Sequence, residues 1–352
     1  MKKINSEFLA SLVAIIVGLL FGLVVLLITD ASNAFQAFGT ILTFGFINMR
    51  NTGEVLYFAT PLIMTGLAVG FAYKTGLFNI GASGQFSMGS FAALYISIQW
   101  TGLPVAIRLP IALISAMLAG AIWAAIPGLL KAYRNVHEVI SCIMTNYIGV
   151  YLVNFIILNT IFDPVRNQTL RVPTEANLPT WGMDRIFKNA IMSSSLNSGF
   201  FLAILAAVII WVILSKTKFG YELKAVGFNR DAAKYAGINE NKNIVLSMMI
   251  SGALAGLGGA LLFLSGTGVA MNVSDVIASE GFTGISVALI GANNPFGIIF
   301  SAILIAYLSL GGSTMQTAGF APEIIEIVIA VIIYLSAFAL VIKNLLDKRG
   351  KA

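Results

Sequence analysis

The sequence predicts an all-α fold, a polytopic membrane helical bundle of about ten transmembrane helices. Hydrophobic residues make up 58% of the 352 residues and charged residues only 10%, whereas an ordinary soluble domain carries about 25% charged residues. Apolar runs long enough to cross a bilayer, about 20 residues, recur along the whole chain. This composition excludes a soluble globular enzyme, a disordered chain and a disulfide scaffold.

One of the predicted spans is interrupted by polar residues, and another is unusually short. Asn79, Ser83 and Gln85 interrupt the third span, and the eighth is short and glycine-rich. We therefore expect a short or re-entrant segment near 280–292, because irregular backbone survives at membrane depth only when it is buried in protein or lines a cavity. The ten predicted spans are 8–28, 55–73, 76–98, 109–130, 138–158, 200–215, 244–264, 280–292, 296–312 and 323–342.

The distribution of Lys and Arg predicts that both termini are cytoplasmic. With the N-terminus inside, 6 of the 21 Lys and Arg residues fall outside, which leaves 15 inside, and cytoplasmic loops are enriched in these residues. An external loop then covers 159–199 and the largest cytoplasmic loop covers 216–243. Neither loop has room for a soluble domain, so 1–352 is predicted to be a single transmembrane domain. The six outside residues are Arg50, Arg108, Arg166, Arg171, Arg185 and Lys188.

Catalytic and metal-binding signatures are missing from the sequence. There is no G-x-x-x-x-G-K-[ST] loop for ATP and no G-x-S-x-G elbow, so we predict no catalytic residue. Cys142 and His137 are the single cysteine and histidine, which leaves no ordinary zinc or copper site. Glu323 and Glu326 lie at the start of the last predicted helix, where the helix dipole favours acidic side chains. An ion-coupling role for Glu326 stays open as the alternative.

Two polar segments lie inside predicted spans. The run from Gly76 to Gln85 places amides in an apolar span, where they indicate either a translocation pathway or hydrogen bonds between helices. In the fifth span Ser141 and Thr145 share a helix face, close to Asn146. Such a face points to the bundle interior or to a pore.

The 216–243 loop and the seventh span contain residues that predict local structure. Asn229 is a predicted N-cap for a short helix 230–236 that ends at Gly237. This helix either lies on lipid headgroups or docks on a cytoplasmic partner. In the seventh span, Gly252, Gly256 and Ala260 recur every four positions, which predicts close helix packing.

Three segments together resemble a known family: Phe78–Gln85, the segment from Glu138 to Tyr147, and 225–233. The chain is similar to permease subunits of bacterial nucleoside ABC importers, within the wider family that also serves ribose, galactose and branched-chain amino acids. The resemblance covers about 55–340. Ser83 stands where many nucleoside permeases carry Glu, and Asp231 replaces Glu in an E-A-A-x-x-x-G coupling motif while keeping the charge.

The resemblance implies a nucleoside importer of the bacterial cell membrane that works by alternating access. A separate ABC ATP-binding subunit would hydrolyse ATP, so this chain would bind no cofactor, and a second related permease and an extracellular substrate-binding lipoprotein would complete the transporter. External loops around 29–54, 159–199 and 313–322 would receive substrate. No nucleic acid partner is expected. The implied substrate pathway comprises Phe78, Asn79, Ser83, Gln85, Asn146 and Tyr147. The implied ATPase-coupling residues are Gly220, Glu222, Ala225, Gly227, Asn229, Asp231, Ala232, Ala233 and Gly237.

Three alternatives remain at this point. A permease for a simple sugar such as ribose fits the same spans. A secondary transporter driven by an ion gradient predicts acidic residues inside the membrane, and few are found. A membrane enzyme requires a catalytic constellation that the sequence does not offer.

Overall fold

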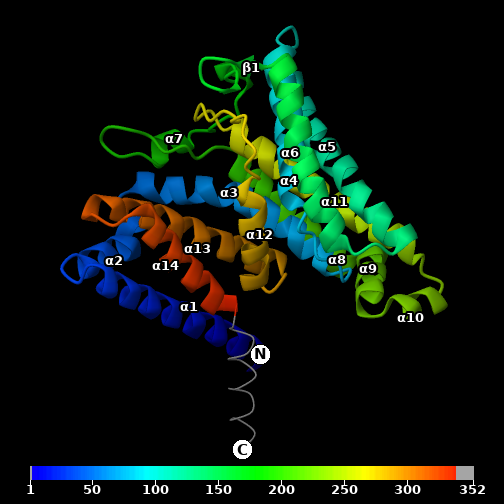
Figure 1. Ribbon diagram of the computed structural model, residues 1–352, viewed down its shortest axis with the longest axis horizontal. Coiled ribbons are helices and arrows are strands. Elements are labelled where there is room, and N and C mark those ends of the chain that lie inside the picture. The colour runs from blue at the N-terminus through cyan, green and yellow to red at the C-terminus, as the bar shows by residue number, and fades with distance from the viewer. Residues whose placement is uncertain (1, 338–352) are drawn as a thin grey trace, which may run out of the picture.

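The computed structural model describes residues 2–337 and is almost entirely helical (Figure 1). Within this range the sheet is limited to two paired two-residue strands, β1 (Phe162–Asp163) and β2 (Gln168–Thr169). The long helices are α1 (Lys2–Thr29), α3 (Met49–Tyr73), α4 (Ala82–Gln99), α5 (Val105–Arg134), α6 (Glu138–Thr160), α8 (Gly199–Lys216), α11 (Glu240–Phe263), α13 (Pro295–Ser313) and α14 (Pro322–Ala337). The shorter ones are α2 (Ala34–Thr43), α7 (Met183–Ile186), α9 (Lys218–Phe228), α10 (Arg230–Tyr235) and α12 (Ser279–Ile290).

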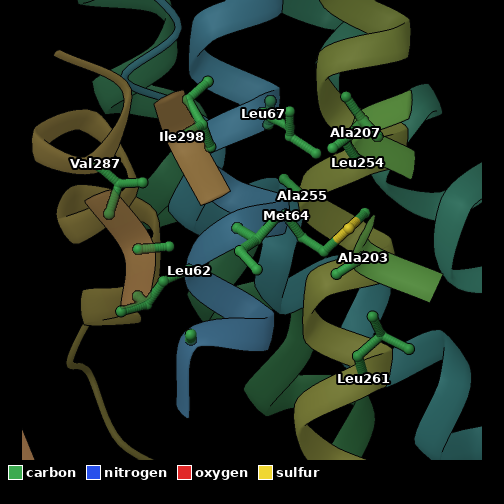
Figure 2. Packing of buried hydrophobic residues seen from close by; sticks show 14 of the residues in the cluster. Leu62, Met64, Leu67, Ala203, Ala207, Leu254, Ala255, Leu261, Val287 and Ile298 are labelled. Atoms are coloured by element: carbon green, nitrogen blue, oxygen red, sulfur yellow. The ribbon is translucent and has the colours of Figure 1, made fainter. Parts of the chain in front are cut away.

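Helix α3 forms the centre of the main hydrophobic core. It packs against α8, α11, α12 and α13, and Met64 and Leu67 on α3 are fully buried. Figure 2 shows Leu62 and Met64 of α3 in one cluster of buried side chains with Ala255 of α11. A helix that is apolar all round and enclosed by other helices is the arrangement expected at the centre of a membrane bundle.

The small-residue pattern predicted to pack helices closely is confirmed. Helices α5 and α11 make the most extensive helix pair in the described part of the chain. Gly120 of α5 lies directly against the backbone of Gly252, and Gly89 of α4 lies against Gly256, so that a side chain at any of these positions would collide with backbone. Small residues let backbones approach in this way without a polar driving force.

The prediction of ten spans is confirmed only in its coarser form. Within residues 2–337, six helices are long and apolar enough to cross a membrane: α3, α5, α6, α8, α11 and the segment Pro295–Thr317. Shorter apolar helices cover Ile16–Thr29, Ala34–Phe46 and Ser279–Ile290. The last is the 12-residue helix α12, in agreement with the short segment predicted near 280–292. The final predicted span, 323–342, begins as α14, and its last five positions lie outside the described residues.

Two boundaries differ from the predictions. The third span is predicted at 76–98, but α4 begins only at Ala82. Gly76, in the turn that follows α3, has a φ of +74°, a left-handed conformation that a right-handed helix cannot contain. The segment 29–54 was predicted to be a loop, yet it contains α2 and the start of α3. Ala37 and Ile41 of α2 are buried against Leu308, an apolar face that the sequence reading overlooked.

The two hydrophilic segments lie at different edges of the molecule. In Figure 1, β1 and α7, both from 159–199, are at the upper edge, whereas α9 and α10, from 216–243, are at the lower right. Helix α10 covers Arg230–Tyr235, with Asn229 as its N-cap and Gly237 in the left-handed region. The short helix predicted at 230–236 is therefore confirmed.

Candidate functional site

The turn between α3 and α4 carries a fully buried amide, that of Asn79. Its nitrogen donates to Gln85 Oε1 at 2.8 Å and to Ser251 Oγ of α11 at 2.7 Å. Its oxygen accepts from the backbone nitrogen of Gly81 at 3.0 Å and from Gln85 Nε2 at 3.1 Å. Every hydrogen-bonding position of this amide is thus used, which is how a buried polar group avoids a desolvation penalty.

Asn146 of α6 completes the same network from the other side. Its oxygen accepts from the backbone nitrogen of Gly84 at 2.8 Å, and its nitrogen donates to the carbonyl of Ile80 at 3.0 Å. The Gly84 N–H belongs to the first turn of α4, where N–H groups lack partners within the helix. Asn79, Gln85 and Asn146, which we call the amide network, therefore fasten the start of α4 to α6 and α11.

The other predicted pathway residues lie apart from the amide network. Ser83 is fully buried and lies against Gly281 of α12, and its hydroxyl has no hydrogen-bond partner among residues 2–337. Phe78 is half-buried and lines a cavity between the end of α3 and α9, which none of the amide-network residues lines. Tyr147 points away from the amide network on the outer face of α6, with 48% of its surface exposed. The contact of these six residues with substrate stays a prediction.

A cavity of about 340 Å³ lies between α4, α6, the end of α11 and the start of α12, and none of the three amide-network residues lines it. Its volume falls in the range of ligand pockets, about 300–1,000 Å³. The aromatic side chains Phe86 and Phe263 line it together with a group of polar residues. The polar lining residues are Ser87, Asn154, Asn272, Ser274, Ser279 and Glu280. We call this cavity the amide cavity.

The amide cavity offers the chemistry that a neutral polar solute requires. Asn154 of α6 donates to the carbonyl of Ser274 at 2.9 Å, which leaves its oxygen as an acceptor, and Glu280 supplies a carboxylate in the first turn of α12. Amides and carboxylates exchange hydrogen bonds with hydroxyls and base edges, while aromatic rings offer a face for stacking. The sequence reading missed these residues, because most of them lie in 269–280, which looks like an ordinary polar loop.

A larger cavity, of about 900 Å³, lies between the 159–199 segment and the start of α5. Glu175 and Asp184 bring negative charge to its rim. Ser265, one of its lining residues, has its Oγ 3.0 Å from Tyr57 Oη, and this contact links α3 to the segment after α11. This cavity has a mixed apolar and polar lining and is built mainly from the predicted external loop.

The predicted coupling segment is held rigidly by its capping residues and glycines. Thr217 caps α9 through the backbone nitrogen of Gly220, and Asn229 caps α10 through that of Ala232. Gly220 lies against the end of α8, and Gly227 lies against the backbone of Lys74. These contacts set the positions of both short helices relative to the ends of α3 and α8 in this conformation.

The side chains of the coupling segment divide into an anchored set and an exposed set. Glu222 accepts from Asn243 Nδ2 of α11 at 3.3 Å, and Ala233 is buried, while Ala225 is half-buried. Asp231 and Ala232 are exposed on α10. The rings that point outward from this segment, listed with their exposed fractions, are Tyr221 (69%), Phe228 (90%) and Tyr235 (95%).

Comparison with known proteins identifies the family. Residues 51–337 match the family described as the permease component of branched-chain amino acid transport systems. The chain belongs to this permease family. It is therefore a transport component with several membrane-crossing helices and not an enzyme; the ATP hydrolysis of such ABC transporters occurs on a separate subunit.

Three curated relatives extend the match over the chain. A guanosine ABC transporter permease protein of Bacillus subtilis is 41% identical over 352 residues, which cover 100% of this chain and 99% of the relative. A nucleoside ABC transporter permease protein of Lactococcus lactis is 37% identical, with 99% and 95% covered. A glucose ABC transporter permease protein of Haloferax volcanii is 30% identical, with 85% and 79% covered.

Proposed function

We propose that the chain is the permease subunit of an ATP-driven importer that moves nucleosides across the bacterial cell membrane by alternating access. The observation that carries the proposal is the full-length similarity, at 41% and 37% identity, to permeases named for guanosine and for nucleosides. The glucose permease shares less identity and a smaller share of the chain. A sugar importer is the second candidate on that account.

The partners follow from the same proposal. The coupling segment, with both termini on its cytoplasmic side, docks in a groove of an ABC ATP-binding subunit. The exposed ring of Tyr235 is the kind of side chain that supplies most of the binding energy in protein interfaces. A second related permease completes the membrane part, and an extracellular substrate-binding lipoprotein delivers cargo near the 159–199 segment. The chain itself binds no ATP.

For the substrate pathway we propose a division of labour. The amide cavity, with Asn154 and Glu280, contacts the cargo, and the amide network supports the helices that bound the cavity. The predicted contact of Asn79, Gln85 and Asn146 with cargo requires a conformation in which α4 and α6 separate. Both roles can be tested by substitution, because their hydrogen-bond partners differ.

The first test is uptake of labelled guanosine, adenosine, uridine and ribose by cells with and without the gene. We expect loss of nucleoside uptake on deletion while ribose uptake persists. Loss of ribose uptake alone would transfer the chain to the sugar importers. Collapse of the proton and sodium gradients at constant ATP is the control for the energy source, and loss of uptake under that condition would contradict an ATP-driven mechanism.

A further inference from the structure

A third cavity, of about 450 Å³, lies where the end of α3 meets α9. It shares no lining residue with the amide cavity. Gly227 of α9 packs against the backbone of Lys74 and Gly76 and so closes one wall. The full lining is Tyr73, Lys74, Gly76, Leu77, Phe78, Lys224, Gly227 and Phe228.

Two lysines face this cavity without a counter-ion. Lys74 and Lys224 are both half-buried, and within residues 2–337 neither takes part in an ion pair or a hydrogen bond of its side chain. The carboxylate of Glu222, on the same helix as Lys224, is already engaged by Lys218 at 3.8 Å and by Asn243. Burial and the positive charge of Lys224 together lower the pKa of Lys74. An anion between the two ammonium groups would relieve this repulsion.

Aromatic side chains line the cavity beside the lysines. Phe78 is half-buried, and the rings of Tyr73 and Phe228 are exposed at the rim. Phosphate alone would use the lysines and leave the rings unoccupied. A ligand with a phosphate and a planar base would use both, since bases stack on aromatic faces. The volume also lies within the range of small-molecule sites.

We propose that this cavity binds a nucleoside monophosphate, with the phosphate between Lys74 and Lys224 and the base against the aromatic rings. The proposal rests on the proposed function, which puts α9 on the cytoplasmic side and makes nucleosides the cargo. A kinase reaction that transfers phosphate to the imported nucleoside would produce this class of ligand inside the cell. The ligand is thus the phosphorylated form of the cargo.

The position of the cavity gives the ligand a regulatory effect. Lys74 belongs to the end of the central helix α3, whereas Lys224 belongs to α9 of the coupling segment. A ligand held by both residues ties the coupling segment to the bundle and restrains their relative movement, on which alternating access depends. Nucleoside monophosphate therefore slows further import.

The binding test uses the complete transporter in lipid nanodiscs without ATP and measures the Kd of labelled guanosine monophosphate. We expect the double variant K74Q/K224Q to raise the Kd at least about tenfold, because each lysine contributes a charge-assisted hydrogen bond, while K224R retains binding. The matched control is K218Q, on the same helix, because Lys218 is 90% exposed and already faces Glu222. An unchanged Kd in K74Q/K224Q would overturn the site.

Two further arms identify the source of the phosphate. Complete competition by inorganic phosphate at the same concentration as guanosine monophosphate would assign the cavity to phosphate alone. Competition that depends on the phosphatidylglycerol content of the nanodiscs would assign it to lipid headgroups. Either outcome overturns the nucleotide assignment.

The functional test measures ATP-driven guanosine uptake into proteoliposomes loaded with ATP. Guanosine monophosphate is either left out or enclosed at about 1 mM, the upper end of typical physiological substrate levels. We expect the loaded nucleotide to slow wild-type uptake several-fold and to leave K74Q/K224Q unaffected. Wild-type uptake that is normal and insensitive to the nucleotide would refute the regulatory site alone. Absence of nucleoside uptake even without the nucleotide would instead refute the proposed function.

Discussion

Replacing Asn79 with leucine removes the centre of the amide network while keeping the side-chain volume similar. The change strands both amide atoms of Gln85 and the backbone nitrogen of Gly81, which now bond to Asn79. Ser251 retains its bond to the carbonyl of Ala68 at 2.6 Å. A stranded buried group costs about 1–3 kcal/mol, and hydrogen bonds between membrane helices average about 0.6 kcal/mol. Three groups at about 1 kcal/mol each give a loss of about 3 kcal/mol.

The single cysteine provides the assay for this prediction. Cys142 is fully buried, and its sulfur lies 3.6 Å from Asn79 Oδ1, so a maleimide reaches it only when the network opens. In a transporter whose partner chains lack cysteine, about 3 kcal/mol corresponds to a labelling rate roughly 100-fold above wild type.

The matched control for this assay is Asn154→Leu. Asn154 lies on the same helix as Cys142, and its side chain makes one hydrogen bond, to the backbone of Ser274. We expect this variant to label within about threefold of wild type, because it leaves only one acceptor to be resolvated. Labelling of Asn79→Leu at the wild-type rate would refute the reasoning that the amide network stabilises the junction.

Three further substitutions separate transport, coupling and docking. Asn154→Leu should reduce nucleoside uptake at least about tenfold while normal amounts of protein insert; unimpaired uptake would remove the amide cavity from the pathway. Gly237→Pro should abolish ATP-driven uptake, because Gly237 has a φ of +80° and proline is confined near −65°. Its control is Gly182→Pro, which forces proline onto a similar φ of +82° but in the 159–199 segment. This control should still co-purify with the ATP-binding subunit, whereas Gly237→Pro should not. Tyr235→Ala should weaken retention of that subunit about tenfold, unlike Trp181→Ala on the opposite segment, and equal retention of both variants would contradict docking through α10.

The parts of the structure that follow from local signals were predictable from the sequence. Helix α10 was placed correctly because Asn229 and Gly237 act through their own backbone geometry, which neighbours in space do not alter. The short helix α12 was predictable from its length, because its 12 residues are fewer than the about 20 that a membrane-crossing helix needs. Close packing along α11 was predictable, because small residues spaced four apart in a membrane helix are typical of surfaces where two helices pack closely.

The parts that depend on distant segments were not predictable. The sequence leaves the polar run near Asn79 open between pathway and packing. Its long-range partners, Ser251 at 172 residues' distance and Asn146 of α6, show that it joins helices in this conformation. The amide cavity was missed for a related reason. It combines Asn154 of α6 with residues after α11, and no periodicity within either segment indicates that the two meet.

One short turn, residues 74–81, joins the coupling segment to the amide network. At one end Gly227 of α9 touches the backbone of Lys74, and Thr75 Oγ1 lies 2.8 Å from Ser247 Oγ of α11. At the other end Asn79 holds the start of α4, a helix that bounds the amide cavity. The contact at Gly227 is between backbones, with no flexible side chain to absorb a displacement, so a movement of α9 toward α3 has to move the turn. Changes within the turn should therefore alter the ratio of ATP hydrolysed to nucleoside imported, whereas changes in the cavity should alter the affinity for cargo.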